Sequence, residues 1–188
     1  MMDEELKQAV KFLKKGRIIL YPTDTIWGIG CDATMARPVE KIYRIKHRYE
    51  SKSLIVLLDH IDKIAGYVKK VPPTAYDLIE SYQEPLTIIY PHAMNLAKNV
   101  VAKDGTIAIR IVRDAFCREL IRIFGKPIVS TSANISGDPP PIAFSKISDE
   151  IKEKVDHIVN FNRDLIIKTK PSTIIRLMDN GEFEMIRK

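Results

Sequence analysis

Short apolar runs that alternate with segments of helical periodicity constrain the fold of this chain more than any other feature. The runs are five to seven residues long and rich in isoleucine, leucine and valine, as buried strands are. They cover 17–21, 53–58, 85–91, 106–112 and 127–131. Amphipathic helical patterns flank or separate them, over 3–16, 36–48, 72–81 and 113–125. This alternation predicts an α/β fold, α+β in strict schemes, with three layers around one mixed, twisted, open sheet.

Local signals predict the remaining elements. Asp59 can cap a helix that runs to about Lys69. Weaker patterns predict a helix near 148–155, a short strand near 157–160, and two strands over 172–178 and 182–188. The last two form a hairpin, because Asn180-Gly181 is a strong turn signal between them.

The bulk properties indicate one globular domain over 1–188, since 45% of its 188 residues are hydrophobic and 29% are charged. The longest apolar runs, such as Leu54–Leu58, are too short to span a membrane, and the acidic start does not resemble a signal peptide. We therefore expect a cytoplasmic protein without membrane association. Cys31 and Cys117 provide neither a disulfide framework nor metal spacing. The net charge of +6 favours anionic partners such as nucleotides or RNA, although a solvated surface explains it too.

The chain lacks the common nucleotide and metal motifs. It contains no G-x-x-x-x-G-K-[ST] loop, and Gly28-Ile29-Gly30 lacks the third glycine of a dinucleotide-binding fingerprint. Its four histidines are scattered without metal-ligand spacing, so packing or surface positions explain them. Any nucleotide must therefore be held in another way, and we expect no resident metal ligands.

Hydroxyls gather where the first strand ends. Thr23 and Thr25 alternate with Asp24, so in strand geometry their hydroxyls share one face. Gly28 and Gly30 would let the backbone approach a ligand closely. Ordinary capping of a strand-to-loop turn explains the same residues, so both interpretations remain open here.

Basic residues close the second predicted helix. Lys46, His47 and Arg48 end it, and Lys52 follows. Cations at a helix C-terminus are favourable by about 0.3–1 kcal/mol, which would explain them without any ligand. The alternative is a phosphate clamp, in which arginine supplies a planar fork and lysines supply point charges.

A third cluster of small polar residues follows the strand over 127–131. Its members are Ser130, Thr131, Ser132, Asn134, Ser136 and Gly137. Hydroxyls and backbone N–H groups at a strand end can cradle phosphate or ribose oxygens. A plain turn needs only one or two such residues. We therefore favour a binding role for this segment.

Taken together and in this order, the motifs resemble the YrdC-like domain of threonylcarbamoyl-AMP synthases. The matching segments are Pro22-Thr23-Asp24-Thr25 with Trp27, Gly28 and Gly30; Lys46-His47-Arg48; Ser53–Leu57; Thr106–Arg110; Ser132-Ala133-Asn134; and Pro171-Ser172-Thr173. They cover nearly the whole chain. Each motif is weak alone, but the ordered set is specific, and it implies the short, single-domain form with a concave basic groove.

The resemblance implies a reaction. Members of the family join L-threonine, bicarbonate and ATP into threonylcarbamoyl-adenylate and release pyrophosphate. Partner proteins then pass the threonylcarbamoyl group to the adenosine beside the anticodon of certain tRNAs. Mg²⁺ would arrive with the phosphates, and Asp24 would at most support it indirectly.

The resemblance also implies roles for single residues. Those expected at the nucleotide are Lys46, Arg48, Lys52, Thr106, Ser132, Asn134, Pro140 and Arg187, with Lys46 and Arg48 acting in catalysis. Those expected at threonine are Thr25, Leu57, Arg110, Ser130 and Ser172. The chain departs from the family pattern at Tyr49, commonly proline, at Trp27, commonly tyrosine, and at Leu57, often histidine. Leu57 could therefore contact threonine only through apolar or backbone atoms.

Two other functions remain open at this stage. A non-catalytic domain that grips tRNA or double-stranded RNA would suit the basic bias, although RNA-binding domains usually show aromatic motifs or stronger basic runs. A different carbamoyl-transfer or maturation enzyme could use the same domain. Such enzymes usually carry further segments, for which we expect no room in 188 residues.

Overall fold

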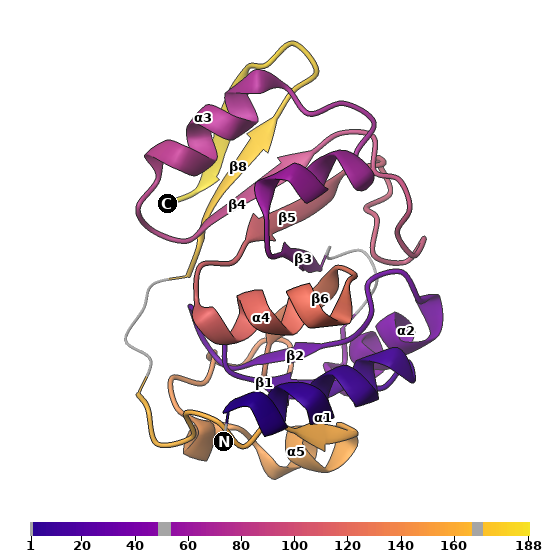
Figure 1. Ribbon diagram of the computed structural model, residues 1–188, viewed down its shortest axis with the longest axis vertical. Coiled ribbons are helices and arrows are strands. Elements are labelled where there is room, and N and C mark those ends of the chain that lie inside the picture. Colours follow the sequence, from indigo (N-terminus) through magenta and orange to yellow (C-terminus); the bar gives the residue numbers. More distant parts are fainter. Residues whose placement is uncertain (1, 49–53, 167–170) are drawn as a thin grey trace.

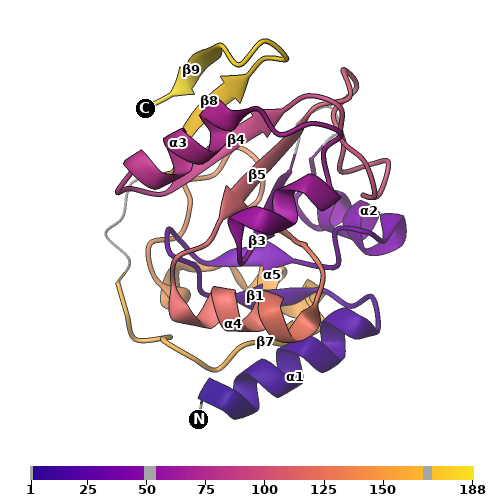
Figure 2. The same ribbon diagram turned by 45° about the horizontal axis from the view of Figure 1, so that its top comes forward.

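The computed structural model describes residues 2–48, 54–166 and 171–188, and these residues form one mixed sheet of nine strands (Figure 1). From edge to edge the strands are β7 (His157–Ile158), β1 (Ile19–Tyr21), β2 (Gly28–Gly30), β6 (Ile128–Ser132), β3 (Ile55–Leu58), β5 (Ile107–Ile111), β4 (Leu86–Tyr90), β8 (Thr173–Leu177) and β9 (Phe183–Arg187). The pairs β1–β7, β3–β5 and β4–β8 are parallel, and the other neighbours are antiparallel. The sheet is twisted, and β9 lies at its free upper edge (Figure 2). The predicted mixed, open sheet is confirmed.

Helices cover both faces of the sheet, as the three-layer prediction requires. On one face, α1 (Met2–Lys14) and α4 (Ala115–Phe124) pack together in a core that includes Leu6, Phe116 and Leu120 (Figure 1). The opposite face carries α2 (Ala36–Ile45), the 3₁₀ helix η1 (Ile61–Gly66), α3 (Pro73–Ser81), the 3₁₀ helix η2 (Phe144–Lys146) and α5 (Asp149–Lys154). Their apolar side chains and the strands build a second, larger core.

Strand alternation separates core from site. On β5, Ile107 and Ile109 point into the larger core, whereas Ala108 and Arg110 point to the other face. Over β6, Ile128 belongs to the core beneath α1 and α4. Those two helices therefore cover only part of this face. The rest, over the end of β6 and over β5, β4 and β8, lies open to a pocket.

The helix α4 shows how local signals set the element bounds. Asp114 accepts a hydrogen bond from the backbone N–H of Cys117 at 2.8 Å, which caps the first turn. Gly125 ends the helix with a φ of 78°, a left-handed conformation that glycine adopts without strain. Both ends agree with the prediction.

The predicted helix from Asp59 to Lys69 is wrong. A 3₁₀ helix spans only Ile61–Gly66, and the cap is His60, whose Nδ1 accepts from the backbone N–H of Asp62 at 3.3 Å. Asp59 instead forms an ion pair with Lys63 at 2.7 Å. Its carboxylate is therefore used along the side of the turn and not at its start.

Glycines explain a strand that the sequence did not predict. β2 is only three residues long and contains Gly28 and Gly30, which carry no hydrophobic periodicity. A Cβ on Gly30 would lie 2.5 Å from the Val129 carbonyl oxygen and 2.7 Å from the Tyr21 ring. The expected ligand approach is therefore wrong for Gly30, which serves sheet packing, while Gly28 does line the pocket.

The terminal hairpin forms as predicted, with β8 and β9 antiparallel. Its turn uses Gly181 at a φ of 86°, and the Gly181 N–H donates to the Met178 carbonyl oxygen at 3.0 Å. The hairpin brings Arg187, on β9, back to the pocket.

Candidate functional site

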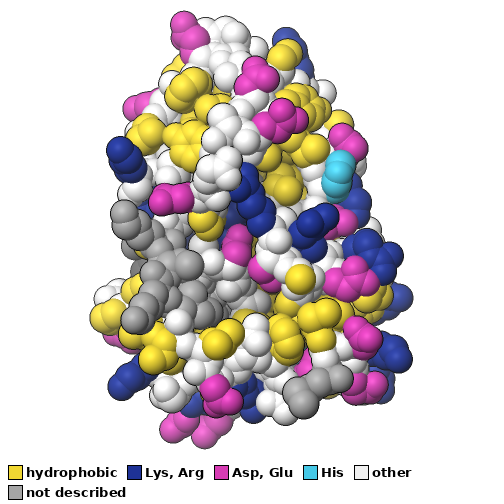
Figure 3. Space-filling view, turned by 60° about the vertical axis from the view of Figure 1, so that its left-hand side comes forward, with side chains coloured by type: hydrophobic (Ala, Val, Ile, Leu, Met, Phe, Trp, Pro, Cys, Tyr) yellow, Lys and Arg dark blue, Asp and Glu magenta, His cyan; other side chains and the backbone are white. Residues whose placement is uncertain are grey.

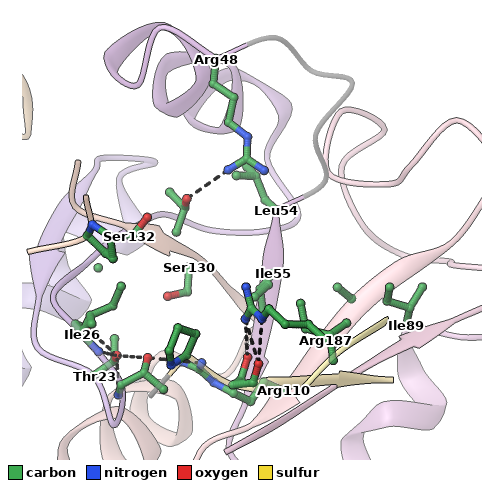
Figure 4. A pocket seen from close by; sticks show the side chains of 18 residues that line it. Thr23, Ile26, Arg48, Leu54, Ile55, Ile89, Arg110, Ser130, Ser132 and Arg187 are labelled. Carbon is green, nitrogen blue, oxygen red and sulfur yellow. Dashed lines mark hydrogen bonds between the residues drawn. The ribbon is translucent and has the colours of Figure 1, made fainter. Parts of the chain in front are cut away.

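A pocket of about 390 Å³ lies on the sheet face that α1 and α4 cover only in part (Figure 4). Its walls come from the β1–β2 loop, the segment after α2, seven strands, the loop after β6 and the residues just before β8. Among the described residues that line it are three arginines, Arg48, Arg110 and Arg187, and no aspartate or glutamate. Figure 4 shows Arg48 reaching in from above Ser130 and Arg187 lying to one side of it. The pocket therefore attracts anions and offers hydroxyls to orient them.

Arg110 forms the charged floor of the pocket. Its guanidinium makes an ion pair with Asp24 at 3.1 Å, and the two side chains are only 5% and 12% exposed. Its Nη1 also donates to the Thr25 hydroxyl at 3.4 Å. Burial raises the pKa of the nearby Asp114 carboxyl, and Asp24 raises it further. A buried guanidinium beside acidic groups is held in place before any ligand arrives.

In the β1–β2 loop, the hydroxyls of Thr23 and Thr25 have different hydrogen-bond partners. The Thr23 hydroxyl accepts from the backbone N–H groups of Thr25 and Ile26, both at 3.2 Å, and donates to the Ile26 carbonyl at 2.6 Å. It also lies 3.1 Å from the Thr25 hydroxyl. Thr23 thus shapes the loop, and Thr25 sits between it and Arg110. The capping interpretation is confirmed for Thr23, and the binding interpretation stays a prediction for Thr25, which lines the pocket.

Lys46 reaches from the end of α2 to the end of β6. Its Nζ donates to the backbone carbonyls of Ser132 at 2.5 Å and Asn134 at 2.6 Å, and lies 3.4 Å from the Asn134 side-chain oxygen. These acceptors are neutral, and within residues 2–48, 54–166 and 171–188 no carboxylate forms an ion pair with Lys46. Burial, with the neighbouring charge of Arg48, lowers the pKa of Lys46 to about 8.

Arg48 extends the same cationic end into the pocket. Its Nη1 donates to the Thr131 hydroxyl at 3.4 Å (Figure 4). Burial lowers the pKa of Arg48 as well. The backbone between them turns sharply, because His47 adopts a φ of 50°. This turn lets Lys46 and Arg48 approach β6 together.

Ser172 and Arg187 close the other end. The Ser172 carbonyl oxygen accepts from Nε and Nη2 of Arg187, at 3.2 and 2.8 Å. The Ser172 hydroxyl lies 2.9 Å from that of Thr87 on β4. Arg187 and Arg110 both line the pocket. Burial lowers the pKa of Arg187, and the charge of Arg110 lowers it further.

The structure brings most of the expected site residues together. Those that line the pocket are Thr25, Arg48, Arg110, Ser130, Ser132, Pro140, Ser172 and Arg187. Lys46 and Asn134 lie behind its wall and bond to each other. Lys52 and Tyr49 lie outside the described residues.

Two expected residues lie elsewhere. Leu57 is fully buried beneath α1 and α4, so the predicted contact of its side chain with threonine is wrong. Ile55, two residues earlier on the same face of the strand, lines the pocket instead. The Thr106 hydroxyl donates to Asp104 at 2.7 Å, in a separate hollow beside the pocket. The two hollows share Ile89 and Ala108, so they adjoin along the sheet.

Sequence reasoning missed the second layer of the site. Asp24 holds Arg110 through an ion pair, and the Thr23 hydroxyl holds the loop. Thr87 lies inside an apolar strand, and no role was predicted for it. A lone polar residue in such a run is the signal that could have found it.

Within 2–48, 54–166 and 171–188, no group of three or more His, Cys, Asp or Glu side chains could hold a metal ion. Within the same ranges, no helix is long and apolar enough to cross a membrane.

The molecule combines a twisted mixed sheet with a pocket, on the open part of one sheet face, that is suited to anions. Sequence comparison identifies the family that has this fold. The model of the Sua5/YciO/YrdC family, described as "Telomere recombination", matches residues 11–188. The chain therefore belongs to the Sua5/YciO/YrdC family.

Relatives give more detail. The "Threonylcarbamoyl-AMP synthase" of Pseudoalteromonas translucida is 33% identical over 97% of this chain and 99% of its own. The protein of the same name from Riesia pediculicola is 29% identical over 96% and 97%. The crystal structure of P. abyssi Sua5 complexed with L-threonine is similar with a TM-score of 0.83 and 26% identity. The alignment covers 97% of this chain and 53% of Sua5, so the chain spans about half of that protein.

Proposed function

We propose that this protein is a threonylcarbamoyl-AMP synthase. It joins L-threonine, bicarbonate and ATP, releases pyrophosphate, and supplies the product to partner proteins that modify the adenosine beside the anticodon of certain tRNAs. The observation that carries the proposal is one pocket with three guanidinium groups, in a chain aligned over nearly its full length with relatives of that name. We further propose that residues 1–188 act as one domain in the cytoplasm, where ATP and tRNA are found.

The chemistry requires two condensations. The threonine amine, in its uncharged form, attacks the carbon of bicarbonate and forms a C–N bond. The bond from that carbon to the bicarbonate hydroxyl breaks, and the hydroxyl leaves as water after taking a proton from the amine nitrogen. An oxygen of the resulting carbamate then attacks the α-phosphorus of ATP, and the bond to pyrophosphate breaks. Neither step needs a covalent enzyme nucleophile, so positioning and charge neutralisation supply the catalysis.

The geometry suggests how the residues share this work. Arg110 would bind the threonine carboxylate, with Thr25, Ser130 and Ser172 around the rest of the amino acid. The phosphates would lie at Arg48 and Ser132, with Lys46 and Asn134 close behind them. Lys52 is proposed here from its motif alone. Pro140 and Arg187 would border the nucleotide.

Thr106 fits this arrangement only if the nucleotide extends into the adjoining hollow. Leu57 would support the threonine end from beneath, without touching the ligand. The described lining contains no carboxylate, so Mg²⁺ would be carried by the phosphates and not by a cage of protein ligands.

The main alternative, a non-catalytic RNA-binding domain, has less support. The surface shown in Figure 3 mixes basic and acidic side chains and has no continuous basic band. The basic groups of the site instead line a hollow of small-molecule size. Weak tRNA contact remains compatible with the enzyme, since its product serves tRNA.

The test is pyrophosphate release from ATP, bicarbonate and an amino acid by the purified chain. We expect release with L-threonine and much less with serine or leucine. Leucine should be the poorer of the two, because losing the hydroxyl leaves buried polar groups unpaired. Equal release with all three would refute threonine specificity. Tight tRNA binding at physiological salt with no pyrophosphate release would favour the RNA-binding alternative.

A further inference from the structure

Thr87 is a buried polar residue to which the proposed function assigns no role. It is the second residue of β4, in the apolar run 85–91, and is 0% exposed. Its strand neighbours Leu86 and Ile88 belong to the larger core, so its own side chain points to the pocket face. It does not line the pocket, because Ser172 lies between it and the hollow.

The register places Thr87 at the centre of the site. Its Cα is paired with that of Arg110 on β5 and with that of Ile174 on β8. Its hydroxyl lies 2.9 Å from the hydroxyl of Ser172, which is 3% exposed. Ser172 in turn holds Arg187 through its carbonyl oxygen. Thr87 is thus one contact from Ser172 and two from Arg187, the pair that closes one end of the pocket.

A threonine at such a position calls for a reason. Burying a hydroxyl is unfavourable unless it is hydrogen bonded, and valine has the same shape without that cost. Threonine is also β-branched, so its side chain has few rotamers and makes a stiff anchor. Ser172 has no such restriction and could otherwise rotate its hydroxyl away from the pocket.

We propose that Thr87 is a positioning residue that fixes the Ser172 hydroxyl toward the amino-acid substrate. This inference rests on the proposed function. Thr87 touches no substrate, and its effect passes through Ser172. Since the backbone of Ser172 also carries Arg187, a smaller effect extends to the nucleotide.

The test compares Thr87→Val with the wild-type chain by calorimetry, with L-threonine and with ATP as separate ligands. One lost hydrogen bond corresponds to a rise in the threonine Kd of about 3- to 10-fold. We expect the ATP Kd to change by less than about 3-fold. Thr87→Ser keeps the hydroxyl and should restore threonine binding to within about 2-fold of wild type.

The Ser172→Ala background separates positioning from general destabilisation. If Thr87 acts through Ser172, adding Thr87→Val to Ser172→Ala should not weaken threonine binding further. Thr34→Val is the matched control, since it also removes a threonine hydroxyl outside the pocket lining, one that donates to Asp32 at 2.6 Å and accepts a long bond from Lys126 at 3.5 Å. It should leave both ligand affinities unchanged.

Several results would overturn the inference. They are a threonine Kd of Thr87→Val within 2-fold of wild type, an equal added loss in the Ser172→Ala background, or failure of Thr87→Ser to bind. If Thr87→Val does not fold, the Ser variant alone and with Ser172→Ala decides the question. Loss of threonine binding by the wild-type chain would refute the proposed function as well, whereas normal wild-type binding with an unaffected Thr87→Val refutes only this inference.

Discussion

Arg110 and Lys46 bring positive charge to opposite ends of one site, and they are held in different ways. Arg110 projects from β5, an interior strand of the sheet, and is neutralised by Asp24 at 3.1 Å. Lys46 follows the last turn of α2 and bonds only to neutral oxygens in the contacts described above. The first arrangement fixes geometry before the ligand arrives. The second keeps charge available for a ligand.

The difference matches the two substrates. An amino acid must be distinguished from close analogues, which requires groups in fixed positions. A chain of phosphates offers much charge and many oxygens, so uncompensated cations bind it without a rigid frame. The comparison predicts that changes at the Arg110 end affect stability and threonine binding together, whereas changes at the Lys46 end affect mainly ATP.

The largest effect should follow Arg110→Met. The substitution leaves Asp24 buried without its cation, so the free energy of unfolding should fall by about 3–5 kcal/mol. Threonine-dependent pyrophosphate release should fall by roughly 100-fold or more, since two charge-assisted contacts are lost. Denaturant unfolding and the pyrophosphate assay measure the two effects.

The double variant Arg110→Met with Asp24→Asn separates them. Removing the unpaired charge should recover most of the stability but none of the threonine affinity. Recovery of both would show that Arg110 serves only the fold, and the comparison would fail at its threonine end.

A smaller and more selective effect is expected from Arg48→Ala. Loss of one charge-assisted phosphate contact, worth about 1.5–3 kcal/mol, should weaken ATP binding by roughly 10- to 150-fold. Threonine binding should change little, because Arg48 lies at the other end of the pocket (Figure 4). Calorimetry with each ligand tests this split.

Arg44→Ala provides a matched control on the same helix. Arg44 is exposed and pairs with Glu40, one turn away. Its removal should leave ATP binding unchanged. If both variants bind ATP like the wild type, the cations at this helix end only stabilise the helix, and the phosphate clamp is wrong.

The sequence predicted what depends on local pattern. Periodicity located the strands that carry Arg110 and Ser130, and the order of motifs indicated which side chains would meet. Pattern could not show that the core beneath α1 and α4 buries Leu57 fully and Ile55 only in part, because that depends on how far a helix extends over the sheet. It also could not distinguish the Thr23 hydroxyl, which is used within the loop, from that of Thr25.

For the same reason, the sequence could not show which residues outside the pocket contact and hold the residues that line it. Asp24 reads as one more polar residue in a loop, and only the fold places its carboxylate against Arg110. The sequence did not predict the β2 strand, because two of its three residues are glycines, which have no hydrophobic side chain. Close packing, not hydrophobicity, requires glycine at Gly30. Roles that depend on contacts between distant segments require the structure.

The smallest effect concerns pH and sharpens the comparison at the Lys46 end. Burial lowers the pKa of Lys46 to about 8, so its charge is present below that pH and is lost above it. Because phosphates favour the charged form, raising the pH from 7 to 9 should weaken ATP binding by about 10-fold. Lys46→Arg stays charged throughout and should bind ATP with little change over this range, which also corrects for titration of ATP itself. Equal pH dependence in both proteins would show that another group governs the change and that Lys46 does not meet the phosphates.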